Sequence, residues 1–122
     1  MSDYSAENLT IQIVPPLNKY QVVEFRGEMD KAGLTEVKGK LEALIENYSL
    51  QYLVFDFGAL DYINSESIGF LMAIHSHLVK TGKALVVVNA KANVKDIFQV
   101  IGLFSVVTYY DTLNQFVEKI GA

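Results

Sequence analysis

The alternation of apolar and polar residues along the chain predicts short strands first and amphipathic helices after them. From Leu9 to Val14 apolar side chains occupy every second position, the period of a strand with one exposed face. Pro15-Pro16 interrupts that period, and Tyr20 to Gly27 predicts a second strand, paired antiparallel with the first. From Asp30 onward the apolar spacing changes to three and four residues, which predicts a helix with Asp30 as its N-cap.

Strands and helices alternate over the rest of the chain. Gly33 and Gly39 lie inside the first predicted helix and both weaken it. Gly82 can take the left-handed conformation that ends the second helix. The remaining predicted elements are strands at Tyr52 to Phe57, Ala84 to Val88 and Val106 to Tyr109, and helices at Ser65 to Lys80, Asn93 to Ile101 and Thr112 to Ile120.

The resulting order, β-β-α-β-α-β-α-β-α, predicts a single α/β domain. Strands that alternate with helices favour a parallel sheet with right-handed crossovers, and the opening pair adds an antiparallel neighbour. We expect a mixed sheet of about five strands with about four helices packed on it. The domain is expected to span residues 9–120, and residues 1–8 are expected to form a flexible N-terminal tail.

Composition excludes several classes of function. The 122 residues suit one domain, and the absence of cysteine excludes disulfides and thiolate chemistry. The net charge is −4 and the basic residues are dispersed, so direct binding of nucleic acid is not expected. No apolar run is long enough to span a bilayer, and the first residues do not resemble a signal peptide. These features predict no membrane insertion and a cytoplasmic location.

The junction Asn64-Ser65-Glu66-Ser67 concentrates polar side chains between two apolar segments. Asn64 is the natural N-cap, which places Ser65 at the first helical position with a hydroxyl that capping does not require. A phosphate at that position would meet unpaired amides and the positive end of the helix dipole. Two interpretations stay open on these residues alone: an ordinary helix start, or a serine presented for phosphorylation.

Other polar residues do not form a catalytic or metal-binding set. His75 and His77 point about 200° apart on a helix and so cannot share an ion; a core or interface role is expected for His75 and a surface position for His77. Asp56 is expected in or at the end of a strand and Asp61 in the following turn, with no pocket to make them an acid–base pair. We therefore expect no enzymatic activity, no cofactor and no metal.

The same junction resembles the STAS domain family, in particular its anti-sigma factor antagonist branch. The family pattern, a strand with an aspartate followed by a loop of the type Ile-Asp-Ser-Ser/Thr-Gly-Leu-Gly, is similar to Val54-Phe55-Asp56-Phe57 and then Ile63-Asn64-Ser65-Glu66-Ser67-Ile68-Gly69. Further similar passages occur before the first helix, after the second and around the last two. They are Gly27-Glu28-Met29-Asp30, Gly82 to Asn89, Val100 to Phe104 and Tyr110-Asp111-Thr112.

The resemblance implies partner switching. In that branch the unphosphorylated domain binds a serine kinase that doubles as an anti-sigma factor; the kinase phosphorylates the domain, the complex dissociates and a phosphatase resets the cycle. The phosphorylated serine corresponds to Ser65 here. The implied partner-binding surface includes the exposed face of the second helix and the residues Asp30, Asn64, Ser65, Glu66, Ser67 and Ile68.

Three departures from the family pattern keep a second function open. Asn64 replaces the family aspartate, Glu66 stands where a second serine or threonine is usual, and Ser67 replaces a glycine. These changes alter the surroundings of the acceptor serine. They favour the alternative of a STAS scaffold that is not phosphorylated and serves as a subunit of a signalling or transport assembly.

Overall fold

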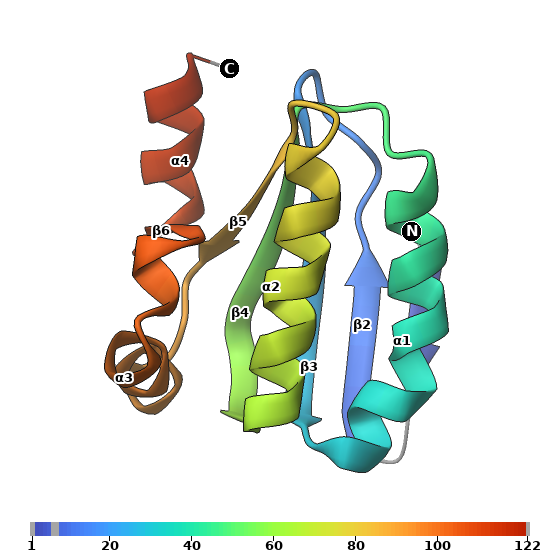
Figure 1. Cartoon of the computed structure of the whole chain (residues 1–122), viewed down its shortest axis with the longest axis vertical. Coiled ribbons are helices and arrows are strands. Elements are labelled where there is room, and N and C mark those ends of the chain that lie inside the picture. The colour runs from blue at the N-terminus through green and yellow to red at the C-terminus, as the bar shows by residue number, and fades with distance from the viewer. Residues whose placement is uncertain (1, 6–7, 122) are drawn as a thin grey trace.

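Six strands form one mixed sheet in sequential order (Figure 1). A computed structural model describes residues 2–5 and 8–121. β1 pairs antiparallel with β2, and β2 pairs antiparallel with β3. From β3 to β6 each strand pairs parallel with the next. The strands are β1 (Ser2–Ser5), β2 (Leu9–Ile13), β3 (Tyr20–Met29), β4 (Tyr52–Ile63), β5 (Ala84–Val88) and β6 (Thr108–Tyr110).

Helices pack on both faces of this sheet, but unequally. Figure 1 shows α1 and α2 side by side in front of the strands and α4 beside the top of the sheet. One core cluster joins α1, α2 and α3 to one sheet face, and a second joins α4 to the other through Phe116. The helices are α1 (Lys31–Glu46), α2 (Ser65–Val79), α3 (Ala92–Ile101) and α4 (Leu113–Ile120), with a short 3₁₀ turn, η1 (Leu103–Ser105).

The predicted order of elements is confirmed from Leu9 onward, and one strand is added before it. The sequence assigned residues 1–8 to a flexible tail, but Ser2–Ser5 form β1 and pair antiparallel with β2. Positions 1, 6 and 7 of the expected tail lie outside the described residues. The sheet therefore has six strands rather than about five.

β4 is twice as long as the apolar run that predicted it. It continues past Phe57 to Ile63 and pairs with β3 as far as its last residue. The prediction that Asp61 lies in a turn is therefore wrong, because Asp61 belongs to the strand. Near the end of that apolar run the pairing register shifts, and there the Asp56 Oδ1 accepts from the Gly58 amide at 2.9 Å. A bulge thus interrupts the pattern without ending the strand.

Candidate functional site

The carboxyl ends of β3 and β4 lie side by side, and each leads directly into a helix. Asp30 follows β3 and caps α1, its Oδ1 accepting from the Gly33 amide at 2.8 Å. Asn64 follows β4 and caps α2, its Oδ1 accepting from the Ser67 amide at 2.8 Å. Both predicted N-caps are confirmed. The amino termini of α1 and α2 consequently meet at one edge of the sheet, at the bottom of Figure 1.

Ser65 is the first residue of α2 and is exposed to solvent. Within the described part of the chain its hydroxyl has no hydrogen-bond partner. The first intrahelical bond runs from the Ile68 amide to the Asn64 carbonyl at 3.1 Å, so the Ser65 and Glu66 amides precede the ladder. An anion on the Ser65 hydroxyl would therefore lie beside unpaired N–H groups at the positive end of a helix of 15 residues.

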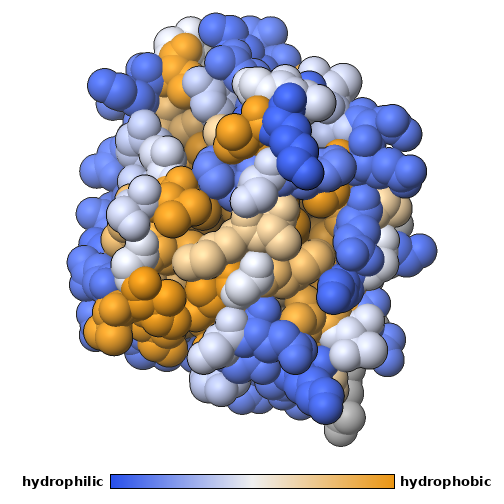
Figure 2. All heavy atoms as spheres, viewed as in Figure 1, coloured by the Kyte–Doolittle hydropathy of each residue, from blue (hydrophilic) through white to orange (hydrophobic). Residues whose placement is uncertain are grey.

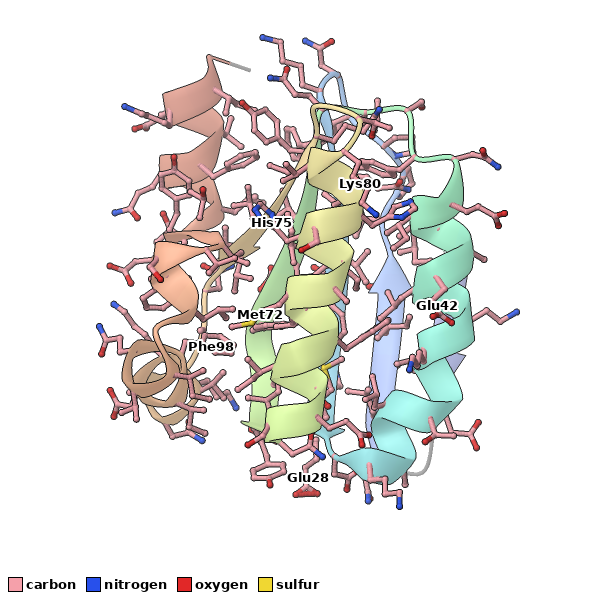
Figure 3. The ribbon with its side chains drawn as sticks, viewed as in Figure 1. Glu28, Glu42, Met72, His75, Lys80 and Phe98 are labelled. Carbon is pink, nitrogen blue, oxygen red and sulfur yellow. The ribbon has the colours of Figure 1, made fainter. Side chains whose placement is uncertain are left out.

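Several carboxylates lie at the end of the sheet where this helix begins. Glu66 is exposed on the first turn of α2, and Figure 3 places Glu28 at the same end of the molecule. Asp61, two residues before the end of β4, forms an ion pair with Lys91 at the start of α3. The Asp61 carbonyl also accepts from Asn93 Nδ2 at 2.9 Å. The amino terminus of α3 is thereby fixed next to the site, and the Lys91 charge is already paired.

Ser67 and Ile68 belong to the core and not to the surface of the site. Ser67 is fully buried and its Oγ donates to the Met29 carbonyl at 3.0 Å. The same carbonyl accepts from the Asn64 amide at 3.1 Å, so the end of β3 holds the start of α2 by two bonds. The sequence placed both residues in the partner-binding surface; burial removes them from it, which corrects that prediction. Asp30, Asn64, Ser65 and Glu66 retain at least partial exposure.

The two histidines of α2 have different surroundings. His75 is half-buried, and its Nδ1 accepts from the Leu85 amide at 3.3 Å (Figure 3). Burial lowers the pKa of His75, which favours the neutral imidazole that this bond requires. His77 is exposed, as expected from the sequence. No group of three or more His, Asp or Glu side chains suited to a metal occurs within residues 8–121.

The sequence could not identify the contacts that join these elements. The partners of Ser67 and Asp61 lie 30 or more positions away along the chain. No local sequence pattern around either residue predicts such a contact. Only the helix caps, whose bonds are local, were accessible from sequence. Within the described ranges, no helix combines the length and apolarity required to cross a bilayer.

Three solved structures of anti-sigma factor antagonists, two of them of SpoIIAA, have the same arrangement. The unphosphorylated form of SpoIIAA has a TM-score of 0.76 and 17% identity, covering 92% of this chain and 97% of its own. The phosphorylated form of SpoIIAA, the Bacillus cell fate determinant, has a TM-score of 0.68 and 16% identity, covering 90% and 98%. An antagonist from Mycobacterium paratuberculosis has a TM-score of 0.82 and 21% identity, covering 93% and 95%.

These structural similarities show the fold of the chain. The family is shown by a comparison of the sequence with family models. The family model described as the STAS domain matches residues 10–116. The match begins in β2 and ends in α4, and it therefore includes both helix caps and Ser65. This chain belongs to the STAS domain family.

Proposed function

We propose that this protein is a regulatory binding protein of the anti-sigma factor antagonist kind that works by partner switching. In its unphosphorylated form it binds an anti-sigma factor that is also a serine kinase. Phosphorylation at Ser65 releases it, and a phosphatase restores the binding form. Since the kinase requires ATP, the cycle runs in the cytoplasm. The protein is the substrate of this reaction and catalyses no step itself.

The observation that carries the proposal is the environment of the Ser65 hydroxyl. It is exposed, it has no hydrogen-bond partner among the described residues, and it stands at the first position of α2. A kinase can reach such an oxygen without unfolding the helix. Because capping is performed by Asn64, modification of Ser65 leaves the Asn64–Ser67 bond of 2.8 Å in place.

Phosphorylation of Ser65 is a direct transfer of the γ-phosphoryl group of ATP. The Ser65 oxygen attacks the γ-phosphorus of ATP, an O–P bond forms, and the bond between that phosphorus and the β,γ-bridging oxygen breaks. ADP leaves, and the serine proton passes to a base on the kinase. The product carries about two negative charges, and the unpaired Ser65 and Glu66 amides can donate hydrogen bonds to its phosphoryl oxygens. The fold therefore tolerates the product.

Release follows from the charge that already surrounds the serine. Glu28 and Glu66 make this edge acidic before phosphorylation, and the phosphoryl group adds to the same sign. A partner fitted closely to the unmodified surface would meet both the volume and the charge of the new group. Within the complex, where water is excluded, such like-charge contacts cost more than in solution.

Apolar surface beside α2 supports a protein partner. Figure 2 shows apolar side chains gathered over the region of α2 and α3, bordered by hydrophilic ones. Val100 and Ile101 of α3 are 88% and 44% exposed. Clustered exposed apolar groups are typical of protein-binding surfaces. The proposed interface thus combines the polar start of α2 with apolar surface beside it.

The test is phosphorylation by a cognate serine kinase. The purified chain is incubated with that kinase and ATP, and the modified residue is located by mass spectrometry. We expect one phosphate on the peptide that contains Ser65, none in Ser65→Ala, and normal modification in Ser76→Ala, a control serine exposed on the same helix. Phosphorylated protein should bind the kinase at least about tenfold more weakly, a difference of about 1.4 kcal/mol.

A non-switching scaffold is the second candidate, favoured by Asn64 and Glu66, which change the residues flanking the acceptor. In that case the chain binds its partner through the same fold, and the charge of Ser65 does not matter. Ser65→Glu separates the two functions: weakened partner binding supports switching, and unchanged affinity selects the scaffold. Phosphate found only at another residue would contradict the switching proposal.

A further inference from the structure

The sheet face opposite α1 and α2 is only half covered. On this face Phe116 of α4 packs against the first residues of β3 and β4, including Tyr20, Val22 and Val54. Farther along the same strands no helix of the described residues covers this face, and the surface is hollowed into a pocket of about 460 Å³, within the size range of small-molecule sites. Its polar lining residues are Thr10, Gln12, Glu24, Arg26, Asp56 and Asn89.

Two carboxylates of this pocket are direct cross-strand neighbours. Glu24 of β3 is the register partner of Asp56 of β4, and both side chains lie on the uncovered face. Adjacent strands are about 5 Å apart, and like charges directly opposite one another destabilise a sheet. No lysine, arginine or histidine of the described residues lies within salt-bridge distance of either carboxylate. The sheet therefore holds two neighbouring carboxylates that have no ion-pair partner among the described residues.

A cation stands close to this pair but is not joined to it. Arg26 follows Glu24 by two residues on the same strand face and lines the same pocket. Its guanidinium forms no hydrogen bond or ion pair with any described residue. Lysines elsewhere do pair, as Lys95 does with Asp111 at 2.7 Å. The pocket thus presents separated charges of both signs.

We propose that this pocket binds a small zwitterion of the free amino acid class. The ammonium group of the ligand lies between Glu24 and Asp56 and removes their mutual repulsion. Its carboxylate accepts a bidentate pair of hydrogen bonds from Arg26, the geometry that a guanidinium favours. In the part of the chain that the structure describes, no third ligating carboxylate or histidine accompanies the acidic pair, which favours an organic ammonium over a metal ion.

Neutral polar groups complete the site around this charge pattern. Gln12 of β2 is the register partner of Glu24, which puts an amide beside the acidic pair. On the other side Asn89 follows β5 with φ +64°, a left-handed conformation that is uncommon outside glycine. Gly58 forms part of the floor; a Cβ there would lie 3.2 Å from Asp56 Oδ1. Glycine at position 58 therefore leaves space beside the Asp56 carboxylate that a side chain would occupy.

This inference does not depend on the proposed function. The pocket lies on the sheet face away from α2, so loss of phosphorylation at Ser65 would leave it unaffected. Binding here would tie the protein to the supply of a small metabolite through a site separate from the partner surface.

The experiment titrates the full chain with each of the twenty free L-amino acids, followed by melting temperature and by amide NMR shifts. The tightest binder is then compared with its amide, which lacks the carboxylate, and its N-acetyl form, which lacks the ammonium. We expect saturable shifts centred on β2, β3 and β4, and at least about a tenfold loss of affinity for either derivative. Glu24→Gln and Arg26→Gln should each produce a similar loss, whereas Glu36→Gln, an exposed control on α1, should not.

A second readout requires no ligand. Glu24→Gln should raise the melting temperature of the free protein by about 1–4 °C, since it removes one member of the repelling pair. The proposal is overturned if no amino acid binds at millimolar concentration, if the amide or N-acetyl form binds as well as the parent, or if Glu24→Gln leaves both binding and melting temperature unchanged.

Discussion

At the scale of single residues, Ser65 and Ser67 show how two neighbouring hydroxyls acquire different roles. Residues two apart on an α-helix point about 200° from one another. Ser65 therefore faces solvent, while Ser67 faces the end of β3 and donates to the Met29 carbonyl at 3.0 Å. One oxygen is available for modification and the other holds the helix that presents it.

Ser67→Ala should lower the free energy of unfolding by about 1 kcal/mol, the net contribution of one buried hydrogen bond. The loss stays small because the Met29 carbonyl keeps its bond from the Asn64 amide at 3.1 Å. The measurement is urea denaturation at equilibrium. Ser76→Ala, at an exposed position of α2, should change stability by less than about 0.5 kcal/mol. Equal effects in the two variants would mean that the buried bond contributes nothing.

Residue by residue, the sequence predicts what is local. Asp30 and Asn64 were identifiable as caps because each bonds an amide three positions on. Ser67 was misplaced on the surface because its partner lies 38 positions earlier in the chain. For Ser65 the helix position was predictable, whereas its freedom from partners depends on what the rest of the fold places around it.

Among elements, α1 contains two glycines that the sequence could not distinguish. A Cβ on Gly39 would meet no atom within 4 Å, whereas a Cβ on Gly33 would lie 2.8 Å from the Glu28 carbonyl oxygen and 3.0 Å from Leu9 Cβ. Gly39→Ala should therefore raise the free energy of unfolding by about 0.5–1 kcal/mol. Gly33→Ala should lower it by about 1–3 kcal/mol, the cost of overpacking.

Thermal and urea unfolding of the two variants check this pair. Each serves as the matched control of the other, since both make the same substitution in the same helix. A gain in stability from both variants would show that β2 and β3 move to make room for a Cβ at position 33 without loss of stability, contrary to the packing described.

The contact between α2 and β5 makes stability depend on pH through His75. Burial lowers the pKa of His75, and its Nδ1 must be unprotonated to accept from Leu85. The unfolded chain, with a histidine pKa of about 6.5, then binds more protons than the folded one. The contribution of neutral His75 is present above about pH 6.5 and diminishes as the pH falls below that value.

Free energies of unfolding at pH 7.5 and 5.5 test this dependence. The parent chain and His77→Gln should lose stability on acidification by similar amounts, because His77 is exposed. His75→Gln, which cannot titrate, should lose less. Since the three proteins contain the same carboxylates, the difference isolates His75. An equal loss in His75→Gln would exclude its role.

The predicted boundaries of the strands were wrong where pairing with a neighbouring strand outweighed the local sequence pattern. The predicted strand ended with its apolar run at Phe57, yet β4 continues to Ile63 because β3 offers a partner along its whole length. β1 was missed for a similar reason, since Ser2–Ser5 lack an apolar period and are ordered by pairing with β2. Edge pairing of this kind is decided by the neighbour more than by the strand's own residues.

For the whole molecule, the sheet separates two cores with different tasks. The larger one fixes α1 and α2 against the face whose carboxyl edge carries Ser65, and the smaller one lies under α4. The sequence predicted one domain and the α/β class, since alternating elements leave few topologies. It could not predict that half of one face stays uncovered, because coverage depends on where α4 docks.

The smaller core can be tested through Phe116, which is 1% exposed and meets the rings of Tyr20 and Tyr52 edge to face at 5.4 and 5.2 Å. Phe116→Ala should lower the free energy of unfolding by about 3–5 kcal/mol. Val100→Ala, at a position 88% exposed, should change it by less than about 0.5 kcal/mol. Because α4 lies across the sheet from α2, hydrogen exchange should increase in α4 and β6 of the Phe116 variant, while amides of α2 slow to exchange should retain protection until global unfolding. Early loss of protection at the start of α2 would show that the two cores are not separate, and that the surface around Ser65 depends on both.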